Sequence, residues 1–177
     1  MRTLMLVLMM TTASPNPDYL VSAILNGDVD QVKQVLEAGV DPNDPRMIKP
    51  GLRLAATACI GQRVETETIV EMIDVLLAHG AKPNLPSDKE LSALMTAAQQ
   101  CPAPVVLRLV KAGADMKFKT SLGITPLSMA FIVGNLDAAE ALIDSGARLS
   151  AEAAAKLKDN KKDDERYHAL LKRAQAK

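Results

Sequence analysis

The sequence has very few aromatic side chains: two Tyr, two Phe and no Trp among 177 residues. Its core must therefore be built from Ala, Leu, Val, Ile and Met, and such residues favour closely stacked helices over a β-sandwich. An excess of charge is also missing, because 21 basic residues balance 21 acidic ones. Without a basic face or stacking aromatic residues, the composition argues against nucleic-acid binding. A chain of this length suits one compact domain or one short array.

The sequence lacks the motifs of catalysis and of metal or nucleotide binding. It contains no HExxH, CxxC, GxSxG or glycine-rich phosphate loop, and only two histidines, His79 and His168. Asp28, Asp30 and Asp41 do not have the spacing of a calcium-binding loop. We therefore expect a protein that is not an enzyme and that uses no metal or other cofactor.

The apolar run near the N-terminus, from Leu4 to Met10, is too short to cross a bilayer as a helix. It follows a single Arg and precedes small residues and several prolines, a layout typical of a bacterial secretory signal. Residues 1–14 are therefore interpreted as a signal peptide, which predicts a periplasmic or secreted protein. The alternative is an apolar helix that covers the open end of the fold, in which case we expect the protein in the cytoplasm.

What the sequence does contain is an internal repeat. Glycines end the predicted second helix of each unit at Gly39, Gly80, Gly113 and Gly146, and the last two intervals are 33 residues long. The first interval is longer, because about nine extra residues lie around 60–68, between the two helices of the second unit. Two helices and a turn at this period indicate a stack of repeated units.

The most regular unit is 123–147. Thr125-Pro126 can start a short helix, Asn135 can cap a second helix, and Gly146 ends it. A helix pair this short cannot bury its apolar faces alone, so it requires copies stacked beside it.

The motifs of these units carry a family resemblance. The fourth unit reads GITPLSMA and LIDSGA, the first NGDVDQVKQVLEAGVDPN, the second IDVLLAHGAKPN and the third LVKAGAD. They resemble the ankyrin repeat family, whose pattern combines G-x-TPLHxA with LLxxGADxN, although no unit keeps the His and two units lack the Thr-Pro pair. The resemblance implies an all-α ankyrin repeat solenoid of about four helix-turn-helix repeats with β-turn fingers.

The resemblance also implies boundaries. Within a repeat region of 15–150, the units fall at about 19–43, 44–84, 85–117 and 118–150. Residues 151–177 no longer match the pattern, and we expect them to form capping helices, or alternatively a tail that binds a partner.

In this family, partners bind to the variable finger and inner-helix positions on the concave surface. We therefore expect a protein partner, with apolar anchors on the fingers, unless these side chains pack between neighbouring fingers. The candidate contact residues are Arg46, Met47, Lys49, Thr57, Asp88, Lys89, Leu91, Gln99, Gln100, Ser121, Leu122, Ile124, Ile132 and Val133.

Cys59 and Cys101 occupy equivalent places in adjacent units, at the ends of the inner helices. Equivalent atoms of stacked helices lie ~8–10 Å apart, which is beyond the usual Cα separation of a disulfide. The insertion after Cys59 and Pro102 after Cys101 could bring the two ends together. The alternatives are a disulfide and a pair of buried thiols.

Two functions follow from these features. The first is a non-catalytic protein-binding module that acts as an inhibitor, immunity factor or adaptor. The alternative is a periplasmic, stress-related accessory protein in which the cysteine pair is redox-active or structural.

Overall fold

The computed structural model describes residues 16–85, 91–158 and 164–175. Within these residues the chain forms α-helices, one short 3₁₀ helix and no strand. The helices are α2 Pro17–Asn26, α3 Val29–Glu37, α4 Gly51–Thr57, η1 Ile60–Gln62, α5 Thr66–Ala78, α6 Ala93–Gln100, α7 Ala103–Lys111, α8 Pro126–Val133, α9 Leu136–Asp144, α10 Ala151–Leu157 and α11 Glu165–Arg173. The interpretation of residues 1–14 as a signal peptide or apolar helix lies outside the described residues.

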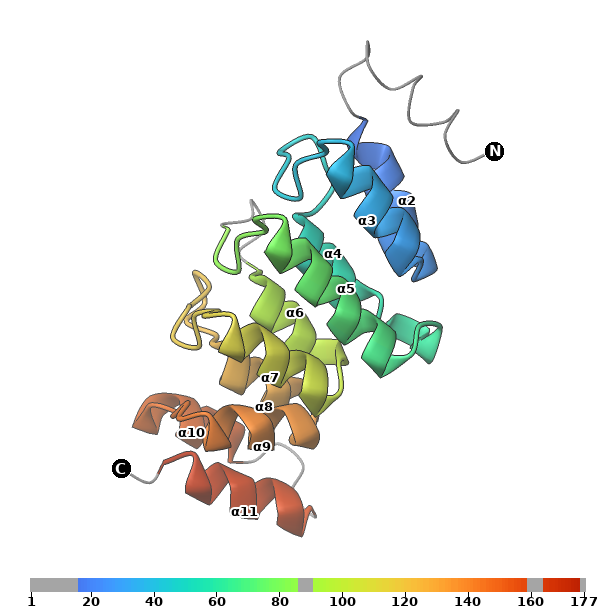
Figure 1. Cartoon of the computed structure of the whole chain (residues 1–177). Coiled ribbons are helices and arrows are strands. Elements are labelled where there is room, and N and C mark those ends of the chain that lie inside the picture. Colours follow the sequence, from blue (N-terminus) through green and yellow to red (C-terminus); the bar gives the residue numbers. More distant parts are fainter. Residues whose placement is uncertain (1–15, 86–90, 159–163, 176–177) are drawn as a thin grey trace.

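The helices pair in chain order and the pairs stack into an elongated two-layer array (Figure 1). One layer contains the inner helices α2, α4, α6, α8 and α10, and the other contains the outer helices α3, α5, α7, α9 and α11. The long loops that enter the inner helices lie on one side, and the short turns between the helices of a pair lie on the opposite side. This arrangement confirms the predicted all-α solenoid.

Capping residues define where most of the helices begin. In seven of the described helices the N-cap side chain accepts a hydrogen bond from a backbone N–H of the first turn, which satisfies a donor that the helix itself leaves unpaired. The residues that do so are Asn16, Asp28, Ser92, Thr125, Asn135, Ser150 and Asp164.

The core between the layers consists mainly of aliphatic side chains. Alanines of the inner helices, such as Ala55, Ala97 and Ala130, are completely buried, and their small size lets neighbouring units approach closely. Aromatic packing occurs at the C-terminal end, where Phe131 and Tyr167 make an edge-to-face contact with ring centroids 5.2 Å apart. The Tyr167 hydroxyl donates a hydrogen bond to the Leu157 carbonyl oxygen at 3.0 Å, so α11 is bound to both α8 and α10.

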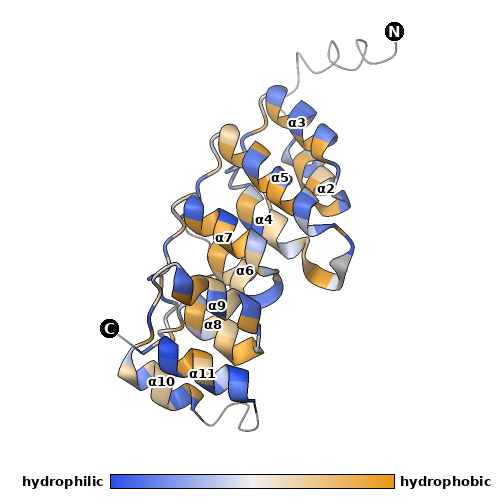
Figure 2. Cartoon of the chain, turned by 60° about the horizontal axis from the view of Figure 1, so that its bottom comes forward, coloured by the Kyte–Doolittle hydropathy of each residue, from blue (hydrophilic) through white to orange (hydrophobic). Residues whose placement is uncertain are grey.

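The outer helices alternate hydrophilic and hydrophobic stretches (Figure 2), and their polar faces carry ion pairs between neighbouring units. Lys33 of α3 pairs with Glu71 of α5, and Arg108 of α7 pairs with Asp74 of α5. At the C-terminal end, Arg166 and Arg173 of α11 pair with three acidic side chains of α9, namely Asp137, Glu140 and Asp144. These pairs are exposed to solvent, so each contributes modestly to stability.

Asparagine side chains connect the long loops of successive units. Asn43 donates to the Gly80 carbonyl oxygen at 2.9 Å and accepts the Lys82 N–H at 2.8 Å. Asn84 makes the same two bonds one unit further on, to Gly113 and Asp115. The third equivalent position holds Lys117, whose ammonium group cannot accept a hydrogen bond.

Among the helices of the described residues, none combines the length and the apolar composition that crossing a membrane requires.

Candidate functional site

The third finger, between α7 and α8, ends in a tight turn. The Thr120 N–H donates to the Ile124 carbonyl oxygen at 3.0 Å, and the Gly123 N–H donates to the Thr120 carbonyl oxygen at 2.8 Å. This turn places Ser121 and Leu122 at the tip, where the Leu122 side chain is 81% exposed. Leu122 therefore does not pack between fingers. Ile124, on the return side of the turn, is half-buried.

In the first finger, the expectation for Met47 is corrected. Met47 is only 7% exposed and belongs to the core, so it is not a surface anchor. The finger turns back because the Met47 N–H donates to the Asp44 carbonyl oxygen, while the Arg46 guanidinium donates to the Asp44 carboxylate. That side-chain hydrogen bond holds the pKa of Asp44 below its ordinary value of 3.8. The neighbouring Ile48 is exposed instead. Two adjacent apolar residues in one finger are the sequence signal that one of them is buried and the other lies on the surface.

The remaining candidates show mixed exposure. Gln99, at the end of α6, and Ile132 and Val133, at the end of α8, are exposed. Lys49, Thr57, Leu91 and Gln100 are half-buried, and the Thr57 hydroxyl donates to the Leu54 carbonyl oxygen at 2.6 Å. Asp88 and Lys89 lie outside the described residues. The exposed apolar candidates therefore concentrate in the fourth unit, on its finger and at the end of its inner helix.

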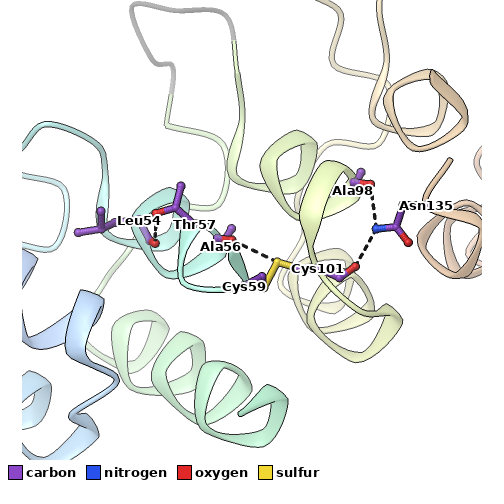
Figure 3. Close-up of a disulfide and its surroundings, with 7 residues drawn as sticks. All are labelled: Leu54, Ala56, Thr57, Cys59, Ala98, Cys101 and Asn135. Atoms are coloured by element: carbon purple, nitrogen blue, oxygen red, sulfur yellow. Dashed lines mark hydrogen bonds between the residues drawn. A yellow bond between two sulfur atoms is a disulfide. The ribbon is translucent and has the colours of Figure 1, made fainter. Parts of the chain in front are cut away.

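A disulfide joins Cys59 to Cys101 (Figure 3), with the two Cα atoms 5.2 Å apart. This separation is shorter than parallel helix ends would allow, and Pro102 supplies the reason. A residue that precedes proline is driven out of the helical region, and Cys101 is extended, with φ −100° and ψ 154°. The Cys101 sulfur thereby reaches the preceding unit, where it also lies 3.2 Å from the Ala56 carbonyl oxygen.

The bridge continues into the next unit. The Asn135 side-chain amide donates to the carbonyl oxygens of Ala98 and Cys101, at 3.2 and 2.9 Å (Figure 3). Asn135 also caps α9 through its side-chain oxygen. One disulfide and one asparagine therefore link the second, third and fourth units on the side opposite the fingers.

The insertion in the second unit divides into two parts. α5 has 13 residues whereas α3, α7 and α9 have 9 each, so part of the extra sequence lengthens the outer helix. The rest forms η1 and the loop up to Glu65, with Gly61 in the left-handed region at φ +74°. Val64 in this loop packs so closely against Gly27 of the first unit that a Cβ atom added to Gly27 would lie 2.9 Å from a Val64 methyl group.

The described residues show no arrangement suited to metal binding. No group of three or more His, Cys, Asp or Glu side chains among them lies close enough together to hold an ion. The groove between α10 and α11 is lined partly by Lys158, His168 and Lys172, and its described lining includes no carboxylate and no cysteine.

Comparison with known proteins identifies the class. The family model for ankyrin repeats in three copies matches residues 52–153, which is more than half of the chain. The chain belongs to the ankyrin repeat family, and such arrays act as binding scaffolds.

Curated relatives cover most of the chain. Human cyclin-dependent kinase inhibitor 2A is 29% identical over 133 residues, which are 75% of this chain and 80% of the relative. Bovine cyclin-dependent kinase 4 inhibitor B is 31% identical over 124 residues, 70% of this chain and 88% of the relative. Human SH3 and multiple ankyrin repeat domains protein 2 is 32% identical over 108 residues, 60% of this chain but 5% of the relative. The three identities are similar, but the two inhibitors match over most of their length, whereas the third relative matches over a small part of its own.

Proposed function

We propose that this protein is a non-catalytic module that binds a partner protein through its finger and inner-helix surface. The observation that carries the proposal is Leu122, an apolar side chain held outward on an ordered turn. Exposure of this side chain does not stabilise the fold, whereas its burial against a partner would contribute about 1.5–3 kcal/mol to the free energy of binding. Ile132 and Val133, at the end of α8, are further exposed apolar side chains of the same unit.

We further propose that binding is inhibitory. The relatives of comparable length are named as inhibitors, and a binding module can inhibit a partner by covering the surface that the partner needs. Exposed Lys117 and Lys119 accompany Leu122 on the third finger, so we expect the partner to present an apolar pocket beside acidic groups. An immunity or adaptor role would use the same surface on a different partner.

The test is affinity capture from a native extract of the source cells, followed by identification and titration of the captured protein. We expect Leu122→Asp to weaken binding at least about tenfold, because it removes an anchor and places a charge in the interface. Leu107→Asp is the matched control, since Leu107 is also an exposed leucine but lies on the outer helix α7. Equal capture by the wild type and the Leu122 variant would refute the proposal, provided that circular dichroism shows both to be folded.

A second candidate function is a stress-related accessory protein in an oxidising compartment, built around the cysteine pair. Burial of the pair favours a structural role, because thiol–disulfide exchange requires access to a sulfur atom. Cys59 and Cys101 are 7% and 1% exposed. Disulfides persist in oxidising compartments, which supports export directed by residues 1–13. Intact mass and N-terminal sequence of the protein from its native cell test this, and retention of Met1 would contradict it.

A further inference from the structure

The side of the array opposite the fingers carries a further surface feature. There the loop between α4 and α5 projects beyond the other inter-helix turns (Figure 1). We name this region, together with the adjoining turn of the first unit, the insertion edge. Its members are Leu25, Asp28, Asp30, Ile60, Arg63, Val64, Glu65 and Glu67.

The projecting loop is held at both ends. Cys59, directly before it, is joined by the disulfide to Cys101 of the third unit. Near the other end, Val64 packs against Gly27 of the first unit. A loop fixed in this way loses little conformational entropy when another molecule binds to it.

This ordered loop presents an apolar side chain to solvent. Ile60 is 56% exposed, and Leu25, in the last turn of α2 next to the Gly27–Val64 contact, is 51% exposed. Ile60 lies outside the finger and inner-helix surface proposed above, whereas Leu25 lies at the end of an inner helix, at the border of that surface.

Four acidic side chains lie within a few residues of these two apolar residues in the sequence. Asp28, Asp30, Glu65 and Glu67 are all exposed, and Arg63 is the single basic member of the edge. None of the four forms an ion pair with a described residue, whereas Glu71, Asp74 and Glu140 of the outer helices all do.

Helix N-termini favour part of this charge, because Asp30 and Glu67 lie in the first turns of α3 and α5. Glu65 is the N-cap residue of α5, but its side chain makes no capping hydrogen bond. Asp28 does cap α3, yet the neutral side chains of Asn16 and Asn135 perform the same task for α2 and α9. Among the described residues, the edge therefore combines acidic side chains that form no ion pair with two exposed apolar side chains.

We propose that the insertion edge is a second docking surface, which binds a basic segment of a partner protein. An aliphatic side chain of that segment packs on Ile60 and Leu25, and its Lys or Arg side chains face Asp28, Asp30, Glu65 and Glu67. Complementary charge selects the segment and the apolar contact holds it. The proposal is independent of binding at the fingers.

The experiment uses the full, oxidised chain and a displayed library of random 12-residue peptides. We expect enriched peptides to combine Lys or Arg with Leu, Ile or Val. One enriched peptide, synthesised with a fluorescent label, is then titrated by anisotropy. Its affinity should fall as NaCl rises from about 50 to about 300 mM, because the charges that attract it are exposed.

Surface variants then locate the site. Ile60→Ser should weaken peptide binding about tenfold through loss of the apolar contact. Glu67→Lys, at the start of α5, should weaken peptide binding by several-fold. The control Glu37→Lys makes the same charge change at the C-terminal end of α3, away from the insertion edge, and should have no effect. Leu122→Asp should also leave peptide binding unchanged, which separates this surface from the finger surface.

Three results would overturn the proposal. The first is a library that yields only acidic peptides or no enriched peptide. The second is an enriched peptide whose binding resists both Ile60→Ser and Glu67→Lys. The third is a homodimer, detected by analytical ultracentrifugation, that Ile60→Ser converts to monomer, because a second copy of the chain would then occupy the edge.

Discussion

Gly27 and Gly80 show how differently two glycines of the same conformation can be constrained. Both end helices with positive φ, +71° and +85°. A Cβ atom at Gly27 would collide with Val64, whereas a Cβ atom at Gly80 would meet nothing within 4 Å. The contact between Gly27 and Val64 fixes the insertion to the first unit.

At these two positions, alanine substitutions should have unequal effects. Gly80→Ala should lower the free energy of unfolding by about 1 kcal/mol, the cost of the left-handed conformation alone. Gly27→Ala should cost about 1–3 kcal/mol more, because Val64 must move. Urea denaturation measures both, and Val64→Ala should remove most of the difference. Equal losses in the two variants would show that Val64 does not constrain the turn.

Among the structural elements, the long loops are connected unevenly. Asn43 and Asn84 each bind the backbone of the following unit through two hydrogen bonds, and Lys117 interrupts the series. The junction between the third and fourth units therefore lacks the acceptor that the first two junctions use.

Restoring that asparagine should stabilise the array. Lys117→Asn should raise the free energy of unfolding by about 1 kcal/mol, since the new amide can donate to the Gly146 carbonyl oxygen and accept the Arg148 N–H. Urea denaturation provides the measurement, with Lys119→Asn, in the same finger, as the control. If both variants behave alike, the asparagine bridge is not the cause.

The docking of α11 on α9 should depend on pH. Hydrogen bonds from Arg166 and then Arg173 hold the pKa of Glu140 below its ordinary value of 4.5. A carboxyl group with a depressed pKa stabilises the fold fully above pH 4.5, and this contribution is lost as the pH falls through the folded-state pKa.

Hydrogen-exchange protection factors at pH 5 and pH 3 would detect the change. We expect α11 to lose protection relative to α6, an inner helix that contains no titratable side chain. Glu140→Gln should reduce protection of α11 at pH 5 and flatten its dependence on pH. If protection of α11 and of α6 changed equally with pH in the wild type, the docking of α11 would not depend on the ionised Glu140.

Most of these elements can be predicted from the sequence, because glycines and capping residues mark helix ends locally. The orientation of Met47 and the distance between the two cysteines depend on tertiary structure, so local sequence signals do not determine them. Whether Met47 or Ile48 points inward depends on how the finger turns at Asp44. The closeness of Cys59 and Cys101 depends on the extended backbone before Pro102. The periodicity of the sequence locates the fingers, but the exposure of Leu122 depends on the turn at the tip of the third finger.

For the whole molecule, the disulfide should be the largest single contribution to stability. It links residues 42 positions apart, and restriction of the unfolded chain by a loop of this size contributes about 4 kcal/mol. The double variant Cys59→Ala, Cys101→Ala should therefore unfold at much lower urea concentration than the oxidised wild type. Wild-type protein reduced in its unfolded state should behave like the variant, and an unchanged midpoint would contradict a bracing role.

The same bond determines how the molecule would respond to tension. When the two ends of the chain are pulled apart, force passes from α4 to Cys59, across the sulfur atoms and on from Cys101 to α7. The segment between the two cysteines, which contains α5 and α6, bears no load. At roughly 3.5 Å per residue, about 150 Å of its contour length is therefore not released when the oxidised chain is stretched. Mechanically, the oxidised array is a shorter chain with a closed ring in its middle.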